Sequence, residues 1–357
     1  MQAIIDQFAS TIRAAADCKA PLRICGGGSK EFYGNHIVGQ SADILDVTAH
    51  SGIVAYEPTE LVVTARTGTR LTDLEAELHK QRQVLAFEPP HFGAAATLGG
   101  CIATGLSGPR RASAGAVRDF VLGMRMLDGR GDDLRFGGQV MKNVAGYDIS
   151  RLMTGSMGTL GLLLEISLKV LPLPPAEMTL SLQMKEAEAI EKMNLWAGKP
   201  LPISATCFCN GVLTLRLSGA EAAVRAAHAK LGGEEVAKGA AFWHSVREQT
   251  HLSFQPGKSL WRLSIKSTAP PLSLPGQQLI EWGGALRWLI SDAEVAAETV
   301  RITASTAGGH ATLFRSGESS GTAFHSLAPE MMSIHRRLKE KFDPMRILNP
   351  GRMYPEL

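Results

Sequence analysis

Residues 23–34, RICGGGSKEFYG, place three consecutive glycines directly after a short apolar run and before a serine and a lysine. The segment matches neither the G-x-x-x-x-G-K-[ST] phosphate loop nor the G-x-G-x-x-G dinucleotide fingerprint, and no long amphipathic helix follows it. Contiguous glycines after a strand can still turn several backbone N–H groups toward one anion, and Ser29 adds a hydroxyl donor. Local sequence therefore leaves two interpretations open for Gly26, Gly27, Gly28 and Ser29: a phosphate-binding loop or a plain turn.

A second glycine-rich segment lies further along the chain, from residue 93 to residue 161. Glycine accounts for 15 of its 69 residues, against a usual share of roughly 7%. The segment also contains clear strand patterns, and glycine this dense inside ordered structure lets the backbone approach a ligand closely. Arg110, Arg111 and Arg118 lie in this segment, with no acidic residue between Gly105 and Arg118. The pattern favours a large, flat or polyphosphate ligand.

Composition limits the class of protein. The chain has 357 residues, 45% of them apolar and 20% charged, which indicates a globular protein of two or three domains. A net charge of +3 gives no reason to expect nucleic acid or an anionic membrane as a partner. No apolar run approaches the roughly 18 to 20 residues of a membrane span, and the N-terminus lacks the pattern of a signal peptide. Five scattered cysteines fit a reducing cytoplasm, which is the location we expect.

The order of elements predicts three parts. Residues 1–175 alternate short strands with helices and end in a proline-rich exit. Residues 176–330 follow a β-α-β-β-α order, which predicts a ferredoxin-like antiparallel sheet with helices on one face. Residues 331–357 form a basic helix followed by a tail rich in proline and glycine.

Two local predictions can be made within these parts. A helix is expected over about 69–83, with Thr69 or Thr72 available as its N-cap. A β-hairpin is expected to turn at Asn210 and Gly211, because Asn-Gly is the preferred pair of a two-residue turn.

Four segments in order along the chain resemble one family of flavoproteins. They are GGGS at 26–29, TLGG…GLSGPRR…VRDFVLGMRMLDGRG within 97–131, KNVAGYDISRLMTGSMGTLGLLLEISLKVLP at 142–172, and FDPMRILNPGRM at 342–353. With these motifs the chain resembles the vanillyl-alcohol-oxidase or PCMH-type FAD-binding family, and within it the flavoprotein 2-hydroxy-acid dehydrogenases. The resemblance spans nearly the whole chain and is closest to the FAD-binding E subunits of bacterial glycolate oxidase, a glycolate dehydrogenase.

This resemblance implies an α+β fold in which two α+β subdomains sandwich FAD, with a ferredoxin-like α+β cap domain after about residue 175. It also implies that the first two motifs surround the diphosphate, that residues 105–111 pass the flavin ring, and that the C-terminal motif returns to the ring. Gly161 to Leu163 would border the adenine end. The implied FAD-contacting residues are Gly26, Gly27, Gly28, Ser29, Thr97, Leu98, Gly99, Gly100, Gly105, Ser107, Gly108, Arg110, Arg111, Gly161, Leu163, Asn349 and Arg352.

The chain departs from the family at two positions. Members similar to D-lactate dehydrogenase carry H-x-G-D-G-N-x-H, whose histidines help to hold a metal near the substrate hydroxyl. The nearest stretch here, STAGGHATLF at 305–314, keeps only His310, and a metal normally takes at least three ligands. We therefore expect no metal site and assign no catalytic residue. Some relatives attach FAD through a histidine after the glycines, where this chain has Ser29, so we expect non-covalent FAD.

The expected function is that of a non-covalent FAD-binding subunit in a complex that oxidises glycolate, or other 2-hydroxy acids, to glyoxylate. The resemblance implies a catalytic FAD subunit and an iron–sulfur subunit as partners, and contact with the inner membrane only through the complex. Two alternatives stay open. One is a stand-alone FAD-dependent 2-hydroxy-acid dehydrogenase with Arg262 or Arg315 on the substrate carboxylate. The other is a structural subunit that binds no flavin.

Overall fold

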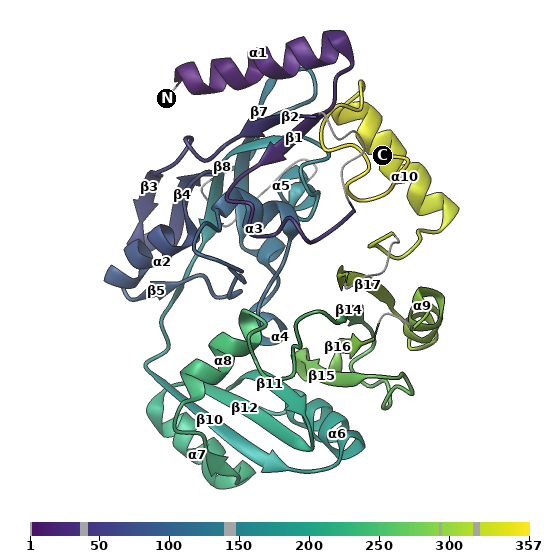
Figure 1. The fold of residues 1–357 in the computed structure, drawn as a ribbon. Helices are drawn as coiled ribbons and strands as arrows, with labels where there is room; N and C mark the ends of the chain where they lie inside the picture. Colours follow the sequence, from purple (N-terminus) through teal and green to yellow (C-terminus); the bar gives the residue numbers. More distant parts are fainter. Residues whose placement is uncertain (1, 36–41, 139–147, 293–294, 317–321) are drawn as a thin grey trace.

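The computed structural model describes residues 2–35, 42–138, 148–292, 295–316 and 322–357 (Figure 1). Residues 142–147, which begin the third motif quoted above, lie outside these ranges. The helices are α1 Gln2–Cys18, α2 Leu71–Lys80, α3 Leu98–Thr104, α4 Arg111–Ala114, α5 Ile149–Met153, α6 Glu186–Ala197, α7 Glu221–Leu231, α8 Gly239–Arg247, α9 Ala297–Thr306 and α10 Pro329–Phe342, with single 3-10 turns η1 Pro58–Glu60, η2 Val117–Asp119 and η3 Trp282–Gly284. The strands are β1 Leu22–Cys25, β2 Asp43–Asp46, β3 Ile53–Glu57, β4 Val62–Arg66, β5 Gln83–Val84, β6 Val121–Leu127, β7 Asp133–Gly137, β8 Leu162–Lys169, β9 Leu171–Pro172, β10 Ala176–Gln183, β11 Ile203–Cys209, β12 Val212–Gly219, β13 Glu234–Glu235, β14 Ser259–Ser264, β15 Gln277–Glu281, β16 Leu286–Ser291 and β17 His310–Arg315.

A small parallel sheet begins the N-terminal half. β1 and β2 pair in parallel, with Leu22 opposite Asp43. α1 is amphipathic and packs its apolar face, including Ile5, Phe8 and Ile12, in one buried cluster with Leu22. Figure 1 shows α1 along the top of the molecule, directly above these two strands.

An antiparallel sheet of five strands, ordered β3-β4-β8-β6-β7, completes this half. In its central strand β8 only Glu165 and Lys169 are half-exposed, and all other residues are buried. The strand is apolar on both faces because both are covered. Leu162 and Leu164 pack in the cluster under α1, while Ile166 belongs to the cluster formed with α2 and α3.

The strands β10 to β17 form one antiparallel sheet of eight strands, ordered β13-β10-β12-β11-β15-β16-β14-β17. The elements from β10 to β13 have the ferredoxin-like order that the sequence predicted. The structure adds a second unit of the same kind, since β14, β15, β16 and β17 repeat that strand order in mirror sequence and β15 pairs with β11. The second unit was missed because residues 265–276, where its first helix would fall, are proline-rich and form a loop.

Both elements of the local predictions are present, since α2 covers Leu71–Lys80 of the expected helix, but the N-cap suggested for that helix is not used. The hairpin is confirmed, because β11 and β12 are joined by Asn210 and Gly211 with φ values of 50° and 79°. The N-cap prediction was wrong, because α2 begins after Arg70 without a side-chain cap. Thr69 Oγ1 instead accepts the N–H of Gly52 at 2.8 Å. The first helical N–H of α2 donates to the carbonyl of Ala96, so it needs no hydroxyl partner.

The C-terminal segment crosses back to the N-terminal half. The N–H of Leu22 donates to the carbonyl of Ile347 at 2.7 Å, and the N–H of Asn349 donates to the carbonyl of Leu22 at 2.9 Å. Residues 347–349 therefore extend the small β1/β2 sheet by one short strand-like contact. Within the ranges given above, no helix combines the length and apolar character needed to cross a bilayer.

Candidate functional site

The glycine loop, residues Gly26 to Ser29, leaves β1 and passes under the backbone of residues 95–97. A Cβ on Gly26 would lie 2.6 Å from Oγ1 of Thr97, and a Cβ on Gly27 would overlap the carbonyl oxygen of Ala95. Gly28 has φ of +67°, a conformation that side chains rarely adopt. The first two glycines are therefore required by close approach and the third by backbone conformation.

The loop presents unused hydrogen-bond donors to a cavity. Among the described residues, the N–H groups of Gly27, Gly28 and Ser29 donate to no acceptor. The loop lines a cavity of about 90 Å³ and, through Gly27, also borders a second cavity of about 720 Å³. Convergent backbone N–H groups of this kind bind anionic oxygens. Sequence-predicted residues that line the smaller cavity are Gly26, Gly27, Gly28, Ser29, Thr97, Gly100, Asn349 and Arg352.

Lys30 places a cation beside this loop, and the sequence analysis did not assign it. Only 7% of its surface is exposed, and its ammonium donates to the carbonyl of His91 at 3.1 Å and to Ser29 Oγ at 3.4 Å. Burial lowers the pKa of Lys30, while the nearby Cys101 and Glu248 act in the opposite direction. The sequence signal was a lysine directly after GGGS, which matched no phosphate-binding motif.

The T-L-G-G motif divides into cavity-lining and packing positions. Thr97 Oγ1 accepts the N–H of Gly100 at 3.2 Å and so caps α3 at the cavity. Leu98 is fully buried, and the N–H of Gly99 donates to the carbonyl of Thr67 at 2.8 Å. Leu98 and Gly99 therefore hold α3 against the sheet, while Thr97 and Gly100 reach the cavity.

The C-terminal motif lies beside the glycine loop, and its residues Asn349 and Arg352 line the same cavity. Asn349 Oδ1 accepts the N–H of Ile24 at 2.8 Å, and Asn349 Nδ2 donates to the carbonyl of Met157 at 2.7 Å. Arg352 donates to the carbonyls of Glu31 and Asn35 at 2.9 and 3.0 Å. These bonds clamp the C-terminal segment over one side of the smaller cavity.

Glu88 holds the segment 105–111 against the eight-stranded sheet. Its carboxylate accepts the N–H of Arg110 at 2.9 Å and pairs with Arg216 of β12 at 2.8 Å. Burial opposes ionisation, yet Arg216 and Arg110 outweigh it and lower the pKa of Glu88. The Arg110 guanidinium also pairs with Glu177 of β10. Arg110 is thus engaged by two carboxylates, an arrangement that the sequence did not reveal.

The rest of this segment is pressed onto the same support. A Cβ on Gly108 would overlap the carbonyl oxygen of Glu88, and the carbonyl of Gly108 accepts the indole N–H of Trp282 at 3.0 Å. Ser107 Oγ accepts the N–H of Val117 at 3.0 Å. Gly105 ends α3 in the left-handed conformation. The segment is therefore fixed by both halves of the chain.

Two arginines share the indole of Trp282. The Arg111 guanidinium lies 4.3 Å from the ring centroid and that of Arg262 lies 5.2 Å from it. Neither has a carboxylate within ion-pair distance among the described side chains, and burial lowers the pKa of both. Arg262 also lines a small chamber, of about 20 Å³, with Ser107 and Gly108. Positive charge is concentrated beside the segment 105–111.

Glu281 lies in the wall of that chamber and was not identified from the sequence. It is 4% exposed, and its carboxyl group accepts the indole N–H of Trp288 at 2.7 Å. Burial raises the pKa of Glu281 to about 7, against the effects of Trp288 and Arg262. The chamber therefore holds a carboxyl group that titrates near neutral pH.

Gly161 and Leu163 lie away from the glycine-loop cavity. Gly161 immediately precedes β8, and a Cβ there would overlap the side chain of Met126. Leu163 is 6% exposed within β8, and its carbonyl accepts the hydroxyl of Thr67 at 2.7 Å. Both residues pack inside the N-terminal half, and neither lines the cavity at the glycine loop.

His310 lies near His325, a neighbour that could not be recognised from the sequence. The rings of His310 and His325 are 6.4 Å apart. Burial, followed by Arg262 and His325, lowers the pKa of His310. Throughout the part of the chain that the structure describes, no three His, Cys, Asp or Glu side chains come together as a metal site.

The loop geometry fits a diphosphate-bearing cofactor. Anionic oxygens need convergent donors and a nearby cation. The glycine loop supplies N–H groups without an acceptor, a close backbone approach that a single Cβ would block, and the buried Lys30. The cavity of about 720 Å³ on the other side of Gly27 lies within the size range of ligand sites.

Comparison with known proteins identifies this cofactor. The FAD binding domain family matches residues 4–137. Glycolate oxidase subunit GlcE of Escherichia coli (strain K12) is 50% identical over 356 residues, which cover 100% of this chain and 98% of that protein. D-lactate dehydrogenase of Anaerostipes hadrus is 30% identical over 183 residues, covering 51% of this chain and 38% of that enzyme. The cofactor is therefore FAD, and the chain is an FAD-dependent oxidoreductase.

A solved structure shows the same fold over nearly the whole chain. Alkyldihydroxyacetonephosphate synthase superposes with a TM-score of 0.66, covering 97% of this chain and 74% of that chain at 16% sequence identity. The predicted α+β fold of the PCMH type is thereby confirmed.

Proposed function

We propose that this chain, which belongs to the GlcE family of glycolate oxidase subunits, is the non-covalent FAD-binding subunit of a complex that oxidises glycolate to glyoxylate. The proposal rests on one observation: the chain is 50% identical to glycolate oxidase subunit GlcE of Escherichia coli, over 100% of this chain and 98% of that protein. The glycine loop supports it, because Gly26 and Gly27 leave no room for a side chain. The N–H groups of Gly27, Gly28 and Ser29 donate to no acceptor among the described residues and could bind an anion.

Bound FAD supplies a redox group that accepts the electrons of the oxidation. The N–H groups of the glycine loop would hold the diphosphate, with Lys30 neutralising part of its charge. Arg111 is the last residue of the segment 105–111, where a cation would stabilise a reduced, anionic flavin ring. Ser29 offers no covalent attachment, so the flavin is held by these contacts alone. In this proposal residues 1–175 bind FAD, residues 176–330 cap it, and residues 331–357 close the site.

Activation of the substrate hydroxyl is assigned to a partner subunit. Removing a hydroxyl proton requires a poised base or a metal, and His310 and His325 are the histidines that face each other here, without a third ligand among the described residues. As the family resemblance implies, we place a catalytic FAD subunit and an iron–sulfur subunit in the complex. The chain itself would be cytoplasmic and would reach the inner membrane only through them.

A second candidate is a stand-alone FAD-dependent 2-hydroxy-acid dehydrogenase. The chamber beside Ser107 and Gly108 favours it, because Arg262 could hold a carboxylate and Glu281 could accept a proton. The chamber has a volume of only about 20 Å³, too small for a 2-hydroxy acid without rearrangement. We therefore rank this function second.

The experiment that separates the two functions uses the purified chain loaded with FAD. Acid precipitation is expected to release free FAD into the supernatant. Glycolate added to the isolated chain should leave the visible flavin spectrum oxidised, and turnover should begin when the catalytic and iron–sulfur subunits are added. Rapid bleaching of the isolated flavin by glycolate would reject the subunit role and establish the stand-alone dehydrogenase.

A further inference from the structure

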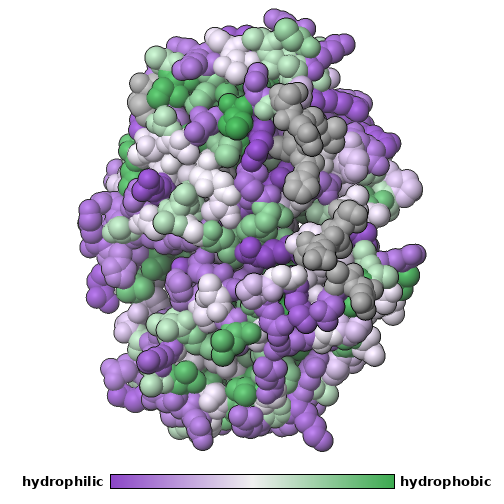
Figure 2. Space-filling model, viewed as in Figure 1, coloured by the Kyte–Doolittle hydropathy of each residue, from purple (hydrophilic) through white to green (hydrophobic). Residues whose placement is uncertain are grey.

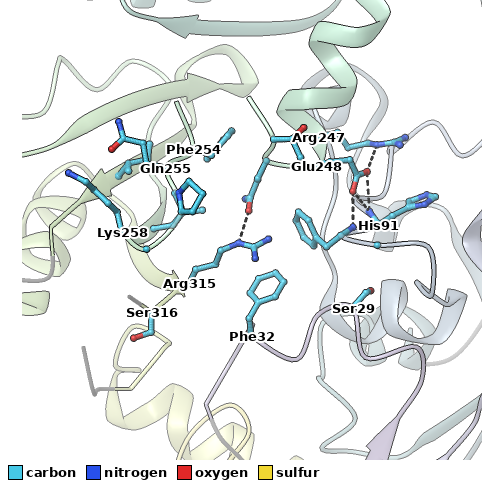
Figure 3. A pocket seen from close by; sticks show the side chains of 18 of the residues that line it. Ser29, Phe32, His91, Arg247, Glu248, Phe254, Gln255, Lys258, Arg315 and Ser316 are labelled. Atoms are coloured by element: carbon cyan, nitrogen blue, oxygen red, sulfur yellow. Dashed lines mark hydrogen bonds and ion pairs between the residues drawn. The ribbon is translucent and has the colours of Figure 1, made fainter. Parts of the chain in front are cut away.

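Glu248 connects the half of the chain that carries the eight-stranded sheet to the N-terminal half. On the face shown in Figure 2, many hydrophilic residues lie at the level where these two halves meet. Glu248 is the C-cap residue of α8, and its carboxylate accepts the N–H of Phe92 at 2.7 Å and that of His91 at 3.1 Å (Figure 3). Arg247 donates to the same carboxylate at 2.8 Å. A carboxylate of one half thus takes two backbone donors of the other.

The peptide group between His91 and Phe92 lies between Glu248 and Lys30. Its N–H is the group that donates to Glu248 at 2.7 Å, and its carbonyl oxygen accepts the ammonium of Lys30 at 3.1 Å. The N–H and the carbonyl of a trans peptide point in opposite directions. The carboxylate and the ammonium therefore lie at opposite ends of one peptide dipole, and each lies at the end that attracts it.

The turn that carries this peptide has an uncommon backbone conformation. Phe92 has φ of +53°, a value that residues other than glycine seldom adopt and that the surrounding structure must stabilise. On another side of the turn, Nε2 of His91 lies 3.1 Å from a carboxylate oxygen of Glu75 in α2. Because Glu248 accepts both N–H groups of the turn, it fixes the direction of the carbonyl that receives Lys30.

Lys30 depends on this carbonyl because it has few other partners. It is 7% exposed and lines the smaller cavity at the glycine loop. Its ammonium also donates to Ser29 Oγ at 3.4 Å, and no carboxylate lies within ion-pair distance of it among the described side chains. An ammonium has three N–H donors. Two described acceptors leave one donor for an anion in the cavity.

Glu248 is the ionised group that supports the charge of Lys30 among the described residues. Burial lowers the pKa of Lys30, and Cys101 of α3 and Glu248 oppose that effect. Burial raises the pKa of Cys101 to about 12, so its thiol is neutral at physiological pH. Burial also opposes ionisation of Glu248, but the N–H of Phe92 and the charge of Arg247 outweigh it and lower the pKa of Glu248. Glu75 faces the ring of His91.

We propose that Glu248 is a positioning residue for FAD, which holds Lys30 at the glycine loop through the peptide group between His91 and Phe92. FAD affinity then depends on a contact between the two halves of the chain, and opening the halves at Glu248 would release Lys30 and weaken FAD. The inference deepens the proposed function and rests on its assignment of the diphosphate to the glycine loop. It gives Glu248 no part in the oxidation of the substrate.

The test is FAD binding by the full chain freed of its flavin, followed by the quenching of flavin fluorescence. Glu248→Gln keeps the size of the side chain but removes its charge, and it should weaken FAD at least fivefold at neutral pH, roughly the low end of couplings between separate sites. Lys30→Met should weaken FAD about tenfold or more, because a charge-assisted contact is lost. In the Lys30→Met background, Glu248→Gln should have an effect of no more than about twofold, since the group it acts through is gone.

The pH dependence of FAD binding is a readout that a general loosening of the two halves would not move. Because the diphosphate needs the protonated form of Lys30, FAD affinity in the parent protein should fall as pH rises through the pKa of Lys30. Glu248→Gln removes a charge that raises this pKa, so the fall should begin at lower pH in the variant. The fall should be absent in Lys30→Met.

Two further variants complete the experiment. Glu235→Gln removes an exposed carboxylate of β13 in the same half and should leave FAD affinity unchanged. Glu248→Asp keeps the charge on a shorter side chain and should bind FAD with intermediate affinity, and it replaces Glu248→Gln in every comparison if that variant does not fold.

Three results would overturn the proposal. They are FAD affinity in Glu248→Gln equal to that of the parent protein, an equal loss of affinity with and without Lys30, or a pH profile in Glu248→Gln that matches the parent. None of them touches the proposed subunit role, which is tested separately by glycolate turnover with the partner subunits.

Discussion

Asp343→Asn is expected to destabilise the protein by about 3 to 5 kcal/mol, because it breaks a buried ion pair and leaves one charge behind. Asp343 pairs with Lys339 of α10 at 2.9 Å, and the two side chains are 0% and 1% exposed. The same carboxylate accepts the N–H groups of Ile347 and Leu348 at 3.2 and 2.8 Å. The pair therefore holds the start of the C-terminal segment in place.

The magnitude follows from what remains around Lys339. Its ammonium donates to the carbonyls of Thr159 and Leu348, both at 2.8 Å, so it keeps hydrogen bonds but loses its counter-charge. Burial already lowers the pKa of Lys339, and Asp343 opposes that effect. Without Asp343 the lysine can escape by losing its proton, and neutralising a lysine of ordinary pKa at pH 7 costs about 4.6 kcal/mol. This value limits the charge penalty from above.

The measurement is urea unfolding followed by circular dichroism, with Glu340→Gln as the matched control on the same helix. Glu340 pairs with Arg346 at 3.7 Å with its side chain 60% exposed, so its loss should change the unfolding free energy by no more than about 1 kcal/mol. FAD affinity should also fall in Asp343→Asn, because the segment held by Asp343 continues to Asn349 and Arg352 at the glycine-loop cavity. A cost below about 1 kcal/mol with unchanged FAD affinity would refute the reasoning.

Two other predictions concern the glycine loop and the small chamber beside Ser107 and Gly108. Gly27→Ala should lose FAD on gel filtration while far-ultraviolet circular dichroism is retained, because its Cβ would displace the carbonyl of Ala95, and undiminished flavin content would count against the cradle. Glu281 has a pKa raised by burial to about 7 in the folded protein, so its contribution to stability is complete below the ordinary glutamate pKa of about 4.5 and is lost as pH rises through about 7, by an amount on the order of 3 kcal/mol. Thermal unfolding from pH 4.5 to 8 should show this decline in the parent protein and a smaller one in Glu281→Gln; identical profiles would contradict it.

Features that depend on residues adjacent in the chain were readable from the sequence. Gly26, Gly27 and Gly28 after a strand predicted a loop, either phosphate-binding or a plain turn, and the Asn210-Gly211 pair predicted its hairpin. Both follow from the φ and ψ angles that each residue type allows. The order of the motifs also predicted the FAD-binding fold, and similarity over the whole chain confirms that fold.

Features that depend on which distant residues meet were decided by the tertiary structure alone. The sequence did not reveal the carboxylate of Glu88 between Arg110 and Arg216 or the second ferredoxin-like unit. Nor did it reveal His325 beside His310. The physical reason is that charge neutralisation and burial are properties of a three-dimensional neighbourhood. Nothing in the sequence distinguishes Arg110 from Arg315. Only the packing pairs Arg110 with two carboxylates and places Arg315 against aromatic rings.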